Sequence, residues 1–75
     1  MNERNFGFEI VLNKPSKNGD HQIVLGKKPS PYTKGGLEFV TWRQFVNPTN
    51  GDFFYESGNY FFDNNEALAD FKTRS

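Results

Sequence analysis

Large aromatic side chains outnumber branched aliphatic ones in this 75-residue sequence. Phe, Tyr and Trp occupy thirteen positions, whereas Ile, Leu and Val occupy ten. A buried Phe or Tyr removes roughly 150–250 Å² from water, so a few rings can fill the core of a short chain. A chain of this size buries only about 60% of its unfolded surface. Each ring must therefore enter the core or remain part of an exposed apolar patch.

The composition excludes several classes of protein. The sequence has no cysteine, so it can form neither a disulfide nor a thiolate zinc site. Its longest apolar run is three residues, which predicts no membrane span and no signal-peptide core. The formal net charge is zero at pH 7, which argues against a general polyanion binder. We expect one cytoplasmic domain over residues 1–75, with no cofactor and no membrane partner.

The charged residues are segregated along the chain. Residues 13–36 contain five lysines and the single acid Asp20, whereas residues 52–70 contain five acids and no base. One interpretation is two solvated faces. The alternative is a dipolar molecule that presents one charged side to a partner, because charge complementarity steers association.

The first 27 residues predict a β-hairpin. Residues 13–20 have turn chemistry, including the pair Asn18-Gly19, and residues 21–27 contain a short apolar run typical of a strand. The preceding segment, residues 5–12, alternates in polarity and predicts the partner strand. Its apolar side chains, expected on one side, are Phe6, Phe8, Ile10 and Leu12.

The next segments predict further strands. Residues 37–46 form the longest candidate strand, with apolar side chains on both faces, and residues 47–51 (NPTNG) predict a hairpin loop. Residues 53–62 read nearly as a mirror about Ser57-Gly58, which predicts a two-residue turn between two short strands of paired aromatics. The alternative is one strand with a bulge at Gly58.

The C-terminal segment predicts a helix. Asp63 is a typical N-cap residue, and Glu66 three positions later completes a variant of the capping box. Ala67, Leu68 and Phe71 then follow at helical spacing as a narrow apolar stripe. The sequence therefore predicts an α+β domain, in which an antiparallel sheet of four to five strands carries one C-terminal helix packed on one face.

This helix is too small to cover all the aromatic side chains. Ten residues of helix are roughly 15 Å long, which covers about half of one face of a four-stranded sheet. The remaining apolar side chains have three possible covers. They can lie under the loop of residues 28–36 and the first hairpin, form a homodimer interface, or meet another molecule.

The sequence offers little for catalysis. His21 is the only histidine, and no HxH or HExxH spacing exists to bind a metal ion. Without cysteine, the usual nucleophile–base pairs would all depend on His21, which is more simply interpreted as a surface residue beside a turn. We therefore expect a protein that is not an enzyme.

A nucleic-acid-binding function is the main alternative to protein binding. Residues 35–42 (GGLEFVTW) partly resemble the ribonucleoprotein strand motif, in which aromatic rings stack on bases. Gly35, however, replaces the basic residue of that motif. In this alternative, the rings stack on a single strand while three lysines bind its phosphates; these are Lys27, Lys28 and Lys34.

The C-terminal half also has a recognisable series of motifs. The residues FVTW at 39–42, GNYFF at 58–62, and the pairs Glu66-Ala67 and Asp70-Phe71 resemble small uncharacterised proteins of phages and other mobile elements of Gram-positive bacteria. This resemblance covers about residues 22–74 and carries no assigned activity. It implies a setting in which small proteins bind a larger host protein, sometimes as inhibitors of a defence system.

We therefore expect a non-catalytic module that binds a larger host protein, with an inhibitor from a mobile element as the specific form that the resemblance implies. A structural homodimer is a further alternative. Large aromatic side chains dominate binding energy because they bury much area at a small entropic cost. The predicted partner-binding residues are Trp42, Tyr55, Tyr60 and Tyr32, with Arg43 for a charged contact.

Overall fold

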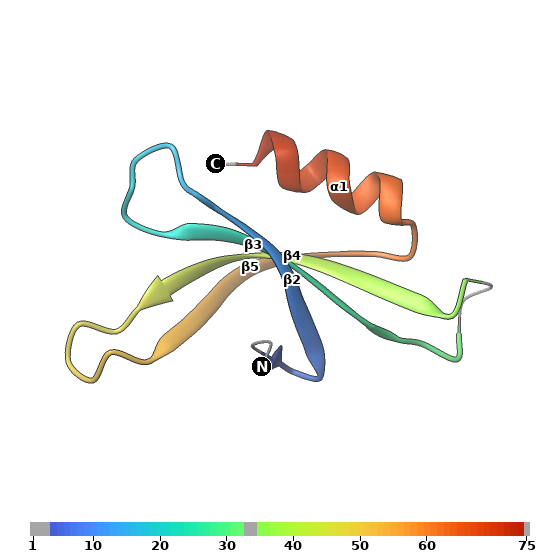
Figure 1. The fold of residues 1–75 in the computed structure, drawn as a ribbon, viewed down its shortest axis with the longest axis horizontal. Helices are drawn as coiled ribbons and strands as arrows, with labels where there is room; N and C mark the ends of the chain where they lie inside the picture. Colours follow the sequence, from blue (N-terminus) through green and yellow to red (C-terminus); the bar gives the residue numbers. More distant parts are fainter. Residues whose placement is uncertain (1–3, 33–34, 75) are drawn as a thin grey trace.

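The computed structural model describes residues 4–32 and 35–74 and places them in an antiparallel sheet with one helix (Figure 1). The strands follow one another in the sheet in chain order, and each is antiparallel to its neighbours. The α+β prediction is confirmed in this form, with four long strands and one of two residues. The elements are β1 (Arg4–Asn5), β2 (Phe8–Pro15), β3 (Gln22–Pro29), β4 (Leu37–Val46), β5 (Phe53–Phe61) and α1 (Asn64–Thr73).

The predicted first strand is interrupted at Phe6-Gly7. Both residues have positive φ, 52° for Phe6 and 82° for Gly7, and they form a two-residue turn between Asn5 and Phe8. Two positive φ angles are typical of the turn whose twist matches that of the flanking strands. The expectation that Phe6 lies within a strand is therefore wrong.

A bulge in β2 changes which side chains share a face. Ile10 lies opposite Gly26 and Leu12 lies opposite Leu25, so Val11 is an extra residue in β2. Because the side-chain period in a strand is two, one extra residue moves the following side chains to the other face. Leu12 is consequently on the face opposite to Ile10, which corrects the predicted alternation.

A second bulge lies in β5. Thr41 pairs with Asn59 and Arg43 pairs with Glu56, so two residues of β5, Ser57 and Gly58, lie opposite Trp42. Residues 53–61 are therefore one strand, and the predicted two-residue turn at Ser57-Gly58 is wrong. The alternative of a single bulged strand is confirmed.

The helix covers one face of the sheet, here called the helix face. Asp63 caps α1 by accepting a hydrogen bond of 3.1 Å from the backbone N–H of Asn65, as its sequence position predicts. The predicted stripe of Ala67, Leu68 and Phe71 packs on the sheet. The core beneath it contains Ile23, Leu25 and Phe39, with Leu37 and Phe61 at its margin.

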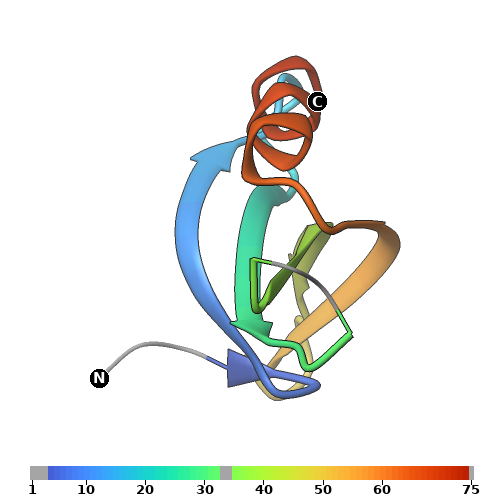
Figure 2. The same cartoon turned by 90° about the vertical axis from the view of Figure 1, so that its right-hand side faces the viewer.

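The opposite face, here called the open face, carries a second core and no helix of the described residues. Figures 1 and 2 show α1 and β1 at opposite sides of the sheet. The buried residues of this second core are Phe8, Val24, Val40 and Trp42, and Ile10 and Tyr55 pack against them. The helix α1 is not long and apolar enough to cross a membrane, and no other helix occurs within residues 4–32 and 35–74.

Candidate functional site

Four exposed apolar side chains surround the core of the open face, and we call them the open-face patch. Phe53 and Tyr60 lie on β5 opposite Val46 and Val40, so their side chains share the face of Trp42. Phe6 reaches the same face from the β1–β2 turn, where its ring centroid is 6.5 Å from that of Trp42. The patch comprises Phe6 (81% exposed), Val46 (55%), Phe53 (52%) and Tyr60 (62%).

Trp42 forms the floor of this patch. Its side chain is only 3% exposed, and the edge of Phe8 meets it at a centroid distance of 5.4 Å and an angle of 87°. Tyr55 packs on it at 5.4 Å and Tyr60 at 6.4 Å. Edge-to-face and tilted ring pairs add about 0.5–1.5 kcal/mol beyond their buried area. The patch is therefore supported by a packed aromatic cluster.

The backbone conformation of Phe6 is costly. A bulky residue at φ 52° is uncommon, because its β-carbon crowds the backbone in the left-handed region. The first position of such a turn usually holds Asn, Asp or Gly. Here it holds an exposed phenylalanine, and strained residues of this kind cluster at functional sites.

The structure separates the five predicted partner-binding residues. Tyr60 is exposed and belongs to the open-face patch, whereas Trp42 is buried beneath it and cannot meet a partner directly. Tyr55 is half-buried, and its hydroxyl accepts a hydrogen bond of 3.0 Å from Nε2 of Gln44. Tyr32 is exposed in the β3–β4 loop. Arg43 is half-buried on the helix face.

The lysines of the nucleic-acid alternative do not form a clamp. Lys27 and Lys28 are consecutive in β3, so their side chains point to opposite faces. Lys28 lies on the open face, where its Nζ is 3.2 Å from a carboxylate oxygen of Glu38 and 4.6 Å from the ring centroid of Phe8. Lys34 lies outside the described residues.

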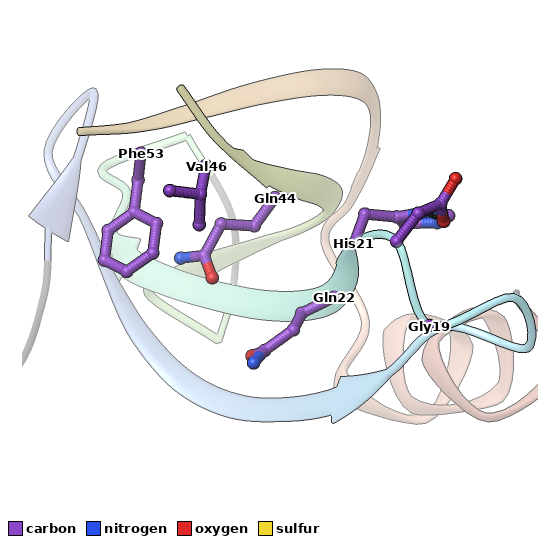
Figure 3. A pocket seen from close by; sticks show the side chains of 7 residues that line it. Gly19, His21, Gln22, Gln44, Val46 and Phe53 are labelled. Carbon is purple, nitrogen blue, oxygen red and sulfur yellow. Dashed lines mark hydrogen bonds and ion pairs between the residues drawn. The ribbon is translucent and has the colours of Figure 1, made fainter. Parts of the chain in front are cut away.

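A shallow pocket adjoins the patch beside Phe53. Its volume is about 220 Å³, and its walls come from the β2–β3 turn and the adjoining ends of β3, β4 and β5. Figure 3 shows the amide of Gln44 beside the ring of Phe53, with Val46 next to them. The pocket therefore places the amide side chains of Gln22 and Gln44 beside an aromatic ring, and Nε2 of Gln44 already donates to Tyr55. The remaining lining residues are Gly19, Asp20 and His21.

His21 points away from this group in Figure 3. Its Nδ1 lies 2.6 Å from Oδ1 of Asp20, and its ring stacks on Phe45 at 5.0 Å. The hydrogen bond to His21 holds the pKa of Asp20 below its ordinary value. The buried Nε2 of His21 has no hydrogen-bond partner among the described residues. Within the same part of the chain, no three His, Cys, Asp or Glu residues lie close enough together to hold a metal ion.

A polar cluster joins the end of α1 to the β5 bulge on the helix face. The Thr41 hydroxyl donates to Oδ2 of Asp70 at 2.5 Å, and Asn59 donates to the same oxygen at 3.2 Å. Arg74 donates to the backbone carbonyl of Thr41 at 2.9 Å and to that of Ser57. Burial lowers the pKa of the Arg74 guanidinium, and nearby Arg43 adds to this effect while Asp70 opposes it. These contacts fix the helix on the sheet.

Sequence reasoning missed three members of the patch, Phe6, Val46 and Phe53. The available signal for Phe6 was the glycine that follows it, since a residue before Gly can begin a two-residue turn. Phe53 and Val46 form the last pair before the β4–β5 turn, where a sheet ends and side chains are least covered.

Comparisons of the chain with protein-family models, with curated proteins and with solved structures give no match. The resemblance to phage and mobile-element proteins therefore stays a prediction.

Proposed function

We propose that this domain is a non-catalytic binding module that attaches to a larger protein through the open-face patch. The observation that supports the proposal most is the exposure of Phe6, Phe53 and Tyr60 around the packed Trp42 cluster. Rings held on a rigid support bind with little loss of side-chain entropy, which is why aromatics dominate interface energies.

The phage or mobile-element setting, and the role of inhibitor of a host defence protein, rest on the sequence resemblance alone. They extend the proposal by naming where such a partner would be found. A stacking site for single-stranded nucleic acid is the alternative function. It is less favoured, because Lys27 and Lys28 lie on different faces and Lys28 is already paired with Glu38.

Site-specific photo-crosslinking tests the proposal. A photoreactive phenylalanine analogue is placed at Tyr60, or at Tyr32 as a matched control on an exposed loop tyrosine. In lysate of the source cells, we expect position 60 to give a discrete protein adduct that position 32 does not give. The adduct should disappear in a Phe6→Ser, Phe53→Ser double variant that carries the same analogue and keeps the wild-type amide spectrum.

Three outcomes would overturn the proposal. Equal adducts from positions 60 and 32 would show that the patch has no preference for a partner. Oligonucleotide binding that weakens steeply with salt and is lost in the same double variant would assign the patch to nucleic acid. A dimer in sedimentation that the double variant converts to a monomer would assign the patch to self-association.

A further inference from the structure

The open face is concave at one end, because side chains of its two outer long strands lean towards each other. The ring centroid of Phe8 on β2 lies 6.1 Å from that of Tyr60 on β5, although β3 and β4 lie between these strands. In a flat sheet, three strand spacings separate such positions by about 14 Å. Gly26 on β3 leaves room for this approach, because a β-carbon there would lie 3.0 Å from that of Phe8. Both rings pack on Trp42, so aromatic side chains border this end of the face.

The shallow pocket beside Phe53 lies at the other end of the same face. Phe53 pairs with Val46 and Tyr60 pairs with Val40, so the two rings are separated by six positions of β4, which is about 20 Å of strand. The pocket of about 220 Å³ accepts a single ring of a partner, whereas an α-helix with its side chains is about 10 Å wide and would lie above it. The occupant that reaches both ends is therefore a narrow, extended segment.

The open face carries no net charge along the four long strands. Lys28 and Glu38 are the only charged residues of β2–β5 whose side chains belong to this face, and they form an ion pair of 3.2 Å. A charged segment would meet no unpaired opposite charge here and would lose part of its hydration. Charge complementarity therefore favours an uncharged segment.

Two exposed polar side chains on this face can donate hydrogen bonds to a partner. They are the amide of Gln22 and the hydroxyl of Tyr60, and neither makes a hydrogen bond within residues 4–32 and 35–74. Figure 3 shows Gln22 extending away from His21, to the side on which the ring of Phe53 lies. A polyproline II segment matches these donors, because its prolines have no N–H and its carbonyls make no hydrogen bonds within the segment. Such segments also dock on surfaces lined by aromatic rings.

We infer that the open face binds an uncharged, proline-rich segment of the partner in the polyproline II conformation. This inference rests on the proposed function and names the chemistry of the partner. Prolines pack against Phe6, Phe53 and Tyr60, one of them enters the pocket, and backbone carbonyls of the segment accept hydrogen bonds from Gln22 and Tyr60. At a rise of about 3.1 Å per residue, a segment of about seven residues spans the face. Because its conformation is formed before binding, the segment loses little entropy.

A capped peptide of L-prolines, long enough to span the face, is the direct probe. The peptide of D-prolines with the same length is its matched control, because it has the same composition and the opposite helical hand. In NMR titrations, we expect the L-peptide to shift the side-chain amide signals of Gln22 and the backbone amide signals of Phe53 and Tyr60. The D-peptide should bind about tenfold more weakly. The affinity for the L-peptide should be the same at low and high salt, because neither surface carries a net charge.

The variant Tyr60→Phe tests the hydrogen bond separately from the ring contact. It keeps the ring and removes the hydroxyl, so the L-peptide should bind about fivefold more weakly. Tyr32→Phe is the matched control, because it removes the hydroxyl of an exposed tyrosine in the β3–β4 loop and should leave the affinity unchanged. Equal affinities of the two variants would overturn the hydrogen-bonding part of the inference.

Two further results would overturn the inference as a whole. One is the absence of any shift with the L-peptide at millimolar concentration, and the other is equal binding of the L- and D-peptides. The photo-crosslink at position 60 is read without these peptides. A discrete adduct there, together with no binding of the L-peptide, would support the proposed function while overturning the polyproline partner, so the two failures are distinguishable.

Discussion

The indole of Trp42 occupies the space that a side chain at position 58 would need. A β-carbon built on Gly58 would lie 2.7 Å from Nε1 of Trp42 and 3.1 Å from a ring carbon of Tyr60. The bulge that places Ser57 and Gly58 opposite Trp42 therefore requires glycine for a steric reason.

Gly58→Ala should destabilise the fold by about 1–3 kcal/mol, because the added methyl group displaces the floor of the open-face patch. Denaturant unfolding followed by tryptophan fluorescence measures the change. Gly35→Ala is the matched control, since a β-carbon there meets no atom within 4 Å. Equal stability of the two variants would contradict the close approach.

Trp42→Ala should cost about 3–5 kcal/mol, which is a large fraction of the stability of a small domain. The sequence places Trp42 among the predicted partner-binding residues, but a side chain that is 3% exposed contributes to folding first. Circular dichroism during denaturation checks this, with Trp42→Phe as the variant that preserves part of the packing. An unfolding midpoint of Trp42→Ala equal to that of the wild type would show that Trp42 does not stabilise the core.

Phe6→Asn should separate binding from stability. Asn-Gly suits a turn with two positive φ angles, so this variant relieves backbone strain and should be at least as stable as the wild type. It also removes the most exposed ring of the open-face patch, so attachment to the partner should weaken at least tenfold. Thermal unfolding and the crosslinking yield at position 60 provide the two readouts. A loss of stability together with full binding would contradict both parts.

Thr41→Val should destabilise the protein by about 1–3 kcal/mol, because the half-buried carboxylate of Asp70 loses the hydroxyl that donates to it. Thr41 is fully buried, and its hydroxyl is 2.5 Å from Asp70. Asn59→Ala removes the second, more exposed donor to the same oxygen and should cost less. Urea unfolding compares the two variants, and a larger effect for Asn59→Ala would show that the Thr41 contact is not the main one.

The Asp20–His21 pair predicts a pH dependence of stability at acidic pH. The pKa of Asp20 is below its model-compound value of 3.8 in the folded state, so the unfolded chain binds the proton more readily. Its contribution is therefore fully present above about pH 5 and is lost as pH falls through the lowered pKa. Comparing wild type with Asp20→Asn by unfolding between pH 2 and 6 should show a difference that disappears at the acidic end. A difference that grows on acidification would have the wrong sign.

The sequence predicted most of the local structure, because its signals are local. Asp63 caps the helix, Asn18-Gly19 lies in the β2–β3 turn, and residues 47–51 join β4 to β5. The two bulges were harder to predict from the sequence. The extra residue at Val11 depends on how β2 aligns with β3, and the choice between turn and bulge at Ser57-Gly58 depends on packing against Trp42.

The site was harder to predict, because exposure is a property of the whole sheet. Trp42 and Tyr60 are both large aromatic residues within predicted strands, yet Trp42 is buried and Tyr60 is exposed. Their difference arises because Trp42 lies on an inner strand, while Tyr60 lies on the edge strand β5. A single sequence does not give the strand order from which that difference follows.

The extra residue at Ser57-Gly58 also determines to which face of the sheet each preceding side chain of β5 points. Deleting Ser57 would exchange the two sides of residues 53–56, turning Phe54 and Glu56 towards the open face and Phe53 and Tyr55 towards the helix. The set of side chains exposed on the open face therefore depends on the number of residues in β5 as well as on their identity.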